Sequence, residues 1–207
     1  MISLCIPTWE AYGNGTWLLN RCLASIRKQT YKDYEIIVSD NSKNNDIFEF
    51  CQGYTLRYLW NPIIGMAANT NNAIKHAKGI IKILYQDDYF VDENSLKDIA
   101  ENFGTADWMI TGCSNNPHPV WTKEIPKGKN TLGSPSCLTM RYPIPMDENL
   151  KWILDCKLYE RLFNMFGWPK ILDKVNVNIG TGEWQETNHL SNELKQAEEH
   201  SGSTTND

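Results

Sequence analysis

Ile80-Ile81-Lys82-Ile83-Leu84-Tyr85-Gln86-Asp87-Asp88-Tyr89-Phe90 is the stretch that decides how this chain folds. Its apolar, β-branched first half predicts a strand that ends at two adjacent carboxylates. Strand ends in α/β sheets face the ligand crevice, and Mg²⁺ or Mn²⁺ relieves the repulsion between two acids there while bridging to substrate phosphates. The stretch therefore indicates a metal-assisted site for a phosphate-bearing substrate, although a surface turn can carry the same acids.

The bulk composition favours a single globular domain. The chain has 207 residues, 41% of them apolar and 22% charged, and its net charge of −5 disfavours a general polyanion binder. No run reaches the ~18 apolar residues of a membrane-spanning helix, and the N-terminus lacks the pattern of a signal peptide. The six cysteines are scattered without a Cys-x-x-Cys motif, so we expect reduced core thiols in a cytoplasmic protein.

Hydrophobic periodicity predicts alternating strands and helices. Strands are expected at 2–6, 34–40, 55–60, 108–113 and 175–179, together with the strand that begins at Ile80. Helices are expected at 17–26, 67–77, 95–103 and 149–166, the last with Asp147 as N-cap, and a long loop at 114–136. This order predicts an α/β domain with a mostly parallel sheet and helices on its faces.

Polar groups recur where the first strands end. Thr8 follows the first strand, Asp40 ends the second, and the 61–65 segment follows the third. Gly65 permits close approach of the backbone to a ligand, and Asn69 opens a helix whose N-terminus can face an anion. Each also has a plain structural interpretation, an Asx turn at Asp40 and a loop-to-helix junction at Gly65.

Several of these segments together resemble the family 2 glycosyltransferases, which have the GT-A fold. The resemblance rests on Ile6-Pro7-Thr8-Trp9, on the run from Leu19 to Ser42, on 61–65, on 69–79 and on Gln86-Asp87-Asp88. It is strong over residues 1–92 and looser to about residue 190. It implies one GT-A domain at 1–192, with a nucleotide-binding half at 1–92 and an acceptor-side half at 93–192, and a flexible polar tail at 193–207.

The resemblance also implies roles for individual residues. The divalent ion, Mn²⁺ or Mg²⁺, would be held by Asp88, with His189 as a further ligand candidate. Family members often carry a basic residue between the positions of Gly65 and Asn69, which is absent here, so positive charge has to come from the metal or from Lys75 or Arg141. The residues implied in donor-nucleotide binding are Pro7, Thr8, Asp40, Asn61, Gly65, Asn69 and Asp87.

On the acceptor side, the resemblance implies an acidic base at the start of a helix, and Asp155 is the candidate. It lies at the border of an apolar helical stripe, where partial burial would raise its pKa toward that of a useful base. Family members often have Glu before this acid, whereas this chain has Leu154, so Asp147 and Glu148 are kept as alternatives. Trp121, in the long loop, is the candidate acceptor contact, because sugars stack on aromatic faces.

The resulting hypothesis is an inverting, metal-dependent transferase that moves a sugar from a UDP-sugar donor to an acceptor hydroxyl. The acceptor is left open among a glycan, a lipid-linked sugar, a protein and a modified nucleic acid. A nucleotidyltransferase on a similar core is one alternative, disfavoured because residues 8–16 contain glycines but no Lys or Arg. A non-catalytic sugar- or nucleotide-binding domain is the other.

Overall fold

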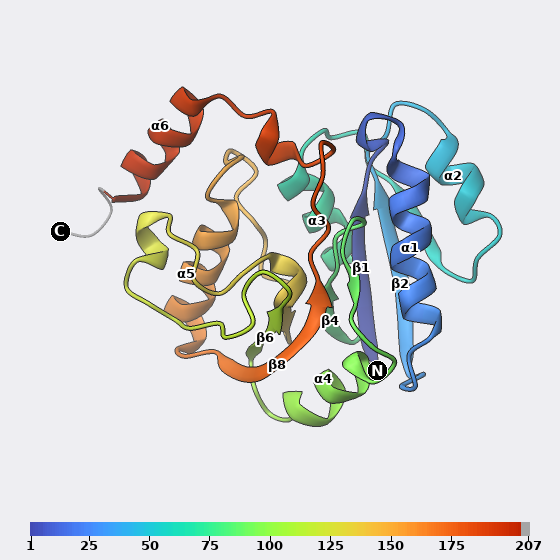
Figure 1. Cartoon of the computed structure of the whole chain (residues 1–207), viewed down its shortest axis with the longest axis horizontal. Helices are drawn as coiled ribbons and strands as arrows, with labels where there is room; N and C mark the ends of the chain where they lie inside the picture. Colours follow the sequence, from blue (N-terminus) through green and yellow to red (C-terminus); the bar gives the residue numbers. More distant parts are fainter. Residues whose placement is uncertain (204–207) are drawn as a thin grey trace.

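A buried strand does precede the acid pair. In a computed structural model that describes residues 1–203, this strand, β4 (Ile80–Ile83), lies near the middle of an eight-stranded sheet (Figure 1). The strand order is β3-β2-β1-β4-β7-β6-β8-β5. Four of the neighbouring pairs are parallel, and β7 runs antiparallel between β4 and β6. The predicted α/β architecture with a mostly parallel sheet is confirmed.

The other strands follow the expected pattern, and two short strands, β5 and β7, are added to it. Every residue of β1 is buried, as is typical of a parallel strand covered by helices on both faces. The remaining strands are β1 (Ile2–Thr8), β2 (Tyr34–Asp40), β3 (Arg57–Trp60), β5 (Tyr89–Phe90), β6 (Trp108–Cys113), β7 (Leu138–Met140) and β8 (Lys170–Asn178).

The helices bury apolar stripes against this sheet. In α1, for example, Leu19, Cys22, Leu23 and Ile26 recur at helical spacing and are fully buried. Figure 1 shows α1 in front of the first strands and α3 behind them. The helices are α1 (Gly15–Arg27), α2 (Asp46–Cys51), α3 (Met66–Lys75), α4 (Ser95–Phe103), α5 (Leu154–Phe166) and α6 (Asn192–Ser203), with single 3₁₀ turns at Ala11–Gly13, Ile125–Lys127, Pro135–Cys137 and Glu186–Asn188.

Strand register places the ends of the first three strands side by side. Thr8 at the end of β1 pairs with Asp40 of β2, and Asp40 pairs with Trp60 of β3. On the other side of β1, Cys5 pairs with Ile83, after which the chain runs to the acid pair. The carboxyl ends of four parallel strands therefore meet at one edge, where α/β proteins bind their ligands.

The start of α5 differs from the expectation. The helix begins at Leu154 and not near residue 149, because the carboxylate of Asp147 accepts the backbone N–H and the side-chain amide of Asn149, both at 3.0 Å. Asp147 therefore closes a local Asx turn and does not cap a helix, a competition that is common for Asp. The strand predicted at 175–179 also begins earlier, at Lys170.

The expected polar tail is helical in part. Helix α6 docks beside the segment that leads into α5, where the carboxylate of Glu198 accepts the backbone N–H groups of Lys151, Trp152 and Ile153 at 2.9, 2.9 and 3.2 Å. Glu199 accepts the Trp152 indole N–H at 2.8 Å. The last part of the expected tail, residues 204–207, lies outside the described residues. Among the described helices, none has the length and apolarity needed to cross a membrane.

Candidate functional site

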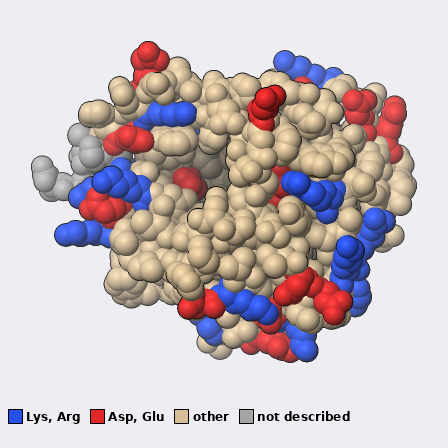
Figure 2. Space-filling model, viewed as in Figure 1, with Lys and Arg blue, Asp and Glu red and all other residues tan. Residues whose placement is uncertain are grey.

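A cavity of about 440 Å³ opens at the carboxyl edge of the sheet. Figure 2 shows this face of the molecule hollowed, with acidic atoms visible inside the hollow and mainly uncharged residues around it. The cavity gathers residues that are far apart in sequence from β1, from the start of α3, from the acid pair and from the start of α5. The sequence-predicted residues among its lining are Pro7, Thr8, Gly65, Asn69, Asp87, Asp88 and Asp155.

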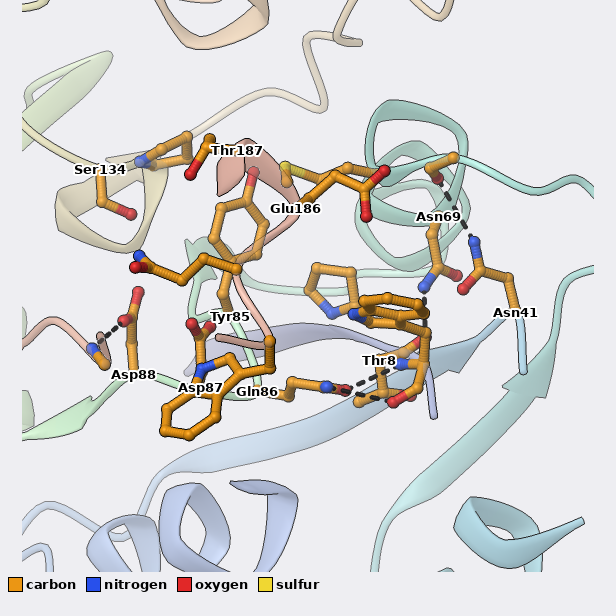
Figure 3. Close-up of a pocket in the computed structure, with 18 of the residues that line it drawn as sticks. Thr8, Asn41, Asn69, Tyr85, Gln86, Asp87, Asp88, Ser134, Glu186 and Thr187 are labelled. Carbon is orange, nitrogen blue, oxygen red and sulfur yellow. Dashed lines mark hydrogen bonds between the residues drawn. The ribbon is translucent and has the colours of Figure 1, made fainter. Parts of the chain in front are cut away.

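Asn69 fixes the side of the cavity formed by β1 and α3. Its amide donates to the backbone oxygen of Thr8 at 2.8 Å (Figure 3). Its amide oxygen accepts the hydroxyl of Ser39 at 2.6 Å. Gly65, just before α3, has a φ of 136°, a conformation that favours glycine. Asn69 thus ties β1, β2 and α3 together, while Gly65 lets the chain turn sharply at the cavity wall.

Asp40 and Asn61, expected to bind the donor nucleotide, are not among the residues that line the cavity. The carboxylate of Asp40 is fully buried and accepts the backbone N–H and hydroxyl of Ser42 at 2.9 and 2.6 Å and the hydroxyl of Tyr58 at 2.8 Å. The backbone N–H of Asn61 donates to the backbone oxygen of Asp40 at 2.7 Å, and the side-chain oxygen of Asn61 accepts the N–H of Ile63. In this structure the side-chain oxygens of both residues are satisfied by hydrogen bonds from nearby parts of the protein.

Gln86 connects the acid pair to the end of β1. Its side chain accepts the backbone N–H of Trp9 at 2.8 Å and donates to the backbone oxygen of Trp9 at 3.1 Å (Figure 3). This paired bond orients Trp9 along the cavity wall, where it meets Tyr12 edge-on at 5.0 Å between ring centroids. The sequence signal for this contact is a lone amide directly before the acids, which does not reveal its partner.

Asp87 and Asp88 lie side by side and present their carboxylates to the cavity (Figure 3). Asp88 is only 2% exposed, and one of its oxygens accepts the backbone N–H of Gly180 at 2.8 Å. A Cβ at Gly180 would lie 2.0 Å from the backbone oxygen of Asp87, so only glycine permits this approach. The same Asp87 oxygen accepts the guanidinium of Arg21 from α1. Segments from both ends of the chain therefore clamp the acid pair.

The electrostatics of the acid pair favour a bound cation. Burial raises the pKa of Asp88 well above its ordinary value, and the neighbouring charge of Asp87 raises it further. Burial also raises the pKa of Asp87, partly opposed by local hydrogen bonds and by Arg21. Two desolvated carboxylates gain most from a divalent cation, which neutralises both.

The donor atoms fit Mg²⁺ or Mn²⁺ held jointly with a substrate. No group of three or more His, Cys, Asp or Glu side chains that could hold a metal forms within residues 1–203. A carboxylate pair without a third protein ligand suits a hard ion that takes its remaining oxygens from substrate phosphates and water. Asp87 and Asp88 are the residues that would hold such an ion.

His189, expected as a further metal ligand, is held away from the acid pair in this structure. Its Nε2 lies 2.8 Å from the backbone oxygen of Glu183, and its ring packs 4.5 Å from that of Tyr12. Neither contact reaches the acid pair, and His189 is not part of the cavity lining. The imidazole instead fastens the 183–189 turn, whose residues Trp184, Gln185, Glu186 and Thr187 do line the cavity.

Asp155 reaches the cavity from the first turn of α5. Its carboxylate accepts the backbone N–H of Cys156 at 2.7 Å and the side-chain amide of Asn130. Asn130 is itself fixed by the N–H groups of Leu132 and Gly133, both at 2.9 Å. Burial raises the pKa of Asp155, with hydrogen bonds opposing the shift. The cavity therefore holds an oriented carboxylate with increased basicity as well as the acid pair.

Trp121, expected to contact the acceptor, is not among the residues that line the cavity. Its ring stacks on Phe163 at 4.4 Å between centroids and meets Trp108 and Trp168 edge-on at 6.0 and 6.4 Å. Aromatic packing against α5 explains this position. Trp152 lines the cavity instead, near Asp155 at the start of α5, and no periodicity in the sequence distinguishes it from a core tryptophan.

The cationic side chains in the cavity wall are also not those expected. Arg141 donates to the backbone oxygens of Gly104 and Ala106 and lies over the ring of Phe103, away from the cavity. Lys75, in the last turn of α3, is not part of the lining either. Lys43 and Lys151 are the lysines that border the cavity.

Comparisons with known proteins show which folds this chain is similar to. Among solved structures, S. aureus TarS 1–349 in complex with UDP-GlcNAc aligns with a TM-score of 0.71 at 18% identity, covering 92% of this chain and 61% of that one. The mannosyltransferase PcManGT from Pyrobaculum calidifontis, in complex with GDP-Man and Mn²⁺, aligns with a TM-score of 0.66 at 15% identity, covering 88% and 57%. The chain thus spans about three fifths of the length of these proteins.

At these identities the likeness concerns the fold, and it confirms the expected GT-A architecture. A search of curated proteins returned no match. The sequence profile described as Glycosyl transferase family 2 matches residues 3–174, which include all the strands except Ile2 of β1 and the last four residues of β8. The match also includes Asp87, Asp88 and Asp155. From this match over most of its length, the chain belongs to glycosyl transferase family 2.

Proposed function

We propose that the protein is an inverting, metal-dependent glycosyltransferase that uses a nucleoside diphosphate sugar, with UDP as the nucleotide. The observation that carries the proposal is that the Asp87–Asp88 pair and Asp155 line one cavity at the carboxyl edge of the sheet. The acid pair suits a metal-bound diphosphate, and Asp155 suits a base for an acceptor hydroxyl. Family membership supports the same reaction class.

The comparisons support the choice of donor. The solved TarS structures include complexes with UDP and with UDP-GlcNAc, and the mannosyltransferase structure contains GDP-Man with Mn²⁺. We propose UDP for this chain and leave the sugar and the acceptor open. The six cysteines are free and buried, which is compatible with the cytoplasmic location that we propose.

In the proposed reaction, the residues divide between the two substrates. Asp155 takes the proton from the acceptor hydroxyl while that oxygen forms its bond to the anomeric carbon of the donor sugar. The bond between the anomeric carbon and the diphosphate oxygen breaks on the opposite face, so the configuration inverts. When bound at Asp87 and Asp88, Mn²⁺ or Mg²⁺ supplies positive charge that stabilises the departing diphosphate.

The donor proposal predicts a cooperative thermal shift. We expect UDP and Mn²⁺ together to raise the unfolding temperature by roughly 5 to 10 °C when free ligand is about 100 times its Kd, because binding to the folded state stabilises it by about 2.7 kcal/mol. UDP alone or Mn²⁺ alone should give a much smaller shift, since the ion would be held by the protein and the diphosphate together. Differential scanning fluorimetry with UDP, UDP-GlcNAc and GDP-Man, with and without Mn²⁺, measures this.

The matched control is the Asp88→Asn variant, in which the combined shift should disappear while the small shift with UDP alone remains. An equal shift with UDP in the presence and absence of Mn²⁺ would contradict metal-dependent donor binding. Release of pyrophosphate from a nucleoside triphosphate, in place of UDP from a UDP-sugar, would instead establish a nucleotidyltransferase.

A further inference from the structure

Lys82 is a buried cation that the proposed reaction does not use. It lies on β4 between Leu4 of β1 and Thr139 of β7, and it is fully buried. Burial lowers the pKa of Lys82 to about 8, opposed by the nearby Cys137 and Asp88, so the ammonium remains mostly protonated at neutral pH. A buried ammonium is costly to keep in a protein core unless it is hydrogen-bonded and compensated by charge.

The partner of Lys82 is Ser136, which is itself fully buried. The ammonium donates to the Ser136 backbone oxygen, and the Ser136 hydroxyl accepts the backbone N–H of Tyr85 at 2.9 Å. Tyr85 then closes the turn that carries the acids, because its backbone oxygen accepts the N–H of Asp88 at 3.0 Å. A continuous path through Ser136 and Tyr85 therefore connects the Lys82 ammonium to the backbone of Asp88.

Ser136 is not held by the hydrogen-bond ladder of the sheet. Ser136 lies in the short turn Pro135–Cys137, outside the strand ladder, and its carbonyl is held by the Lys82 ammonium.

We propose that Lys82 is a positioning residue for the metal site: it holds Ser136, and through Ser136 it sets the turn from Tyr85 to Asp88 in the arrangement that accepts the divalent ion. This inference rests on the proposed function. It predicts that removing Lys82 changes the metal affinity in the opposite direction from a simple charge effect. A positive charge near Asp88 repels a cation, so removing it tightens metal binding if charge alone matters and weakens binding if positioning dominates.

The test measures Mn²⁺ affinity of the Lys82→Met variant at saturating UDP, by titration calorimetry or by the electron paramagnetic resonance signal of free Mn²⁺. We expect the Mn²⁺ dissociation constant to rise by about tenfold or more, the usual effect of losing a residue that orients metal ligands. UDP affinity without Mn²⁺ should not change, whereas a general loosening of the cavity would weaken it as well. Unchanged or tighter Mn²⁺ binding by the folded variant would overturn the inference.

Two further variants separate positioning from damage to the core. Ser136→Ala removes the hydroxyl while keeping the carbonyl, and it should weaken Mn²⁺ binding too. The variant that combines Lys82→Met with Ser136→Ala should bind Mn²⁺ about as tightly as whichever single variant binds it less well. The two residues act through one path, so their effects should not add. Thr139→Val is the matched control: Thr139 faces Lys82 across the ladder, its buried hydroxyl has no hydrogen-bond partner within the described part of the chain, and its loss should leave Mn²⁺ binding unchanged.

The other possible results of these binding measurements also support or overturn the role of Lys82. If Lys82→Met does not fold, Ser136→Ala carries the test, and wild-type Mn²⁺ affinity in that variant overturns the inference. Fully additive losses in the double variant would show two independent effects and would likewise overturn it. Wild-type protein that binds UDP but no Mn²⁺ would contradict the proposed function itself, a result that no Lys82 variant can produce.

Discussion

The Asp88→Asn variant is expected to lose sugar transfer by at least about a thousandfold while the protein stays folded. The substitution keeps an oxygen that can accept the N–H of Gly180, so the clamp on the acid pair is preserved. What it removes is the negative charge that the divalent ion requires. Initial rates of UDP release from UDP-sugar at saturating Mn²⁺, together with the unfolding temperature, measure the two effects separately.

The stability of this variant provides an independent check. The pKa of Asp88 is raised in the folded protein. Folding therefore becomes less favourable as the pH rises from the ordinary pKa of an aspartate to this raised pKa. Without metal at neutral pH, the Asp88→Asn variant should therefore be at least as stable as the wild-type protein. Asp173→Asn, which changes an exposed carboxyl paired with His118, is the matched control and should retain full activity. Wild-type rates in Asp88→Asn would disprove the metal role.

The Asp155→Asn variant should lose about 10²- to 10⁴-fold in kcat, the usual contribution of a general base. Binding of UDP and Mn²⁺ should be nearly unchanged, because Asp155 lies on α5 and is not part of the acid pair. The amide oxygen that replaces the carboxylate can still accept the N–H of Cys156, so the helix start is kept. Steady-state kinetics and a parallel UDP and Mn²⁺ titration distinguish this loss from the loss in Asp88→Asn.

The pH dependence of wild-type transfer tests the same assignment. Burial raises the pKa of Asp155, and a base works only when deprotonated, so kcat should fall as pH decreases through that raised pKa. In Asp155→Asn this acidic limb should disappear. Stability has the opposite dependence: the raised pKa makes folding more favourable as pH falls, so the variant should be more stable than wild type at neutral pH. A full rate in Asp155→Asn would move the role to another group.

Asp147 and Glu148, the two alternative bases, make contacts elsewhere in the structure. Asp147 is engaged in its own turn with Asn149, and Glu148 accepts the side-chain amide of Asn71 from α3 at 2.8 Å. Neither lines the cavity. Of these three acids, Asp155 is thus the one that lines the cavity.

The first half of the chain could be predicted from its sequence because local pattern and fold agree there. Buried strands such as β1 and β4 are apolar runs that end at polar residues, and parallel pairing brings Thr8 and the acid pair to the same edge. The boundaries of α4, Ser95–Phe103, match the expectation at both ends, since its apolar stripe is regular. Local periodicity and the order of elements were sufficient for these predictions.

The secondary structure of the second half could not be predicted from local sequence, because contacts between distant residues determine it. The three-residue strand β7 exists only through pairing with β4 and β6, which no local pattern reveals. Helix α6 depends on Glu198 meeting three N–H groups more than forty residues earlier in the chain. Distant contacts also place single residues: Asp40 accepts the hydroxyl of Tyr58, and Trp121 stacks on Phe163, partners that lie far along the chain from them.

The proposed chemistry requires that Asp87 and Asp88 hold a divalent ion against the diphosphate of a nucleotide donor. Anomalous diffraction at the manganese absorption edge, from crystals grown with UDP and Mn²⁺, examines this requirement without relying on activity. We expect one strong anomalous peak joined to the carboxylate of Asp88 and to a diphosphate oxygen. A peak elsewhere on the molecule, or bound UDP with no manganese beside residues 87 and 88, would contradict it.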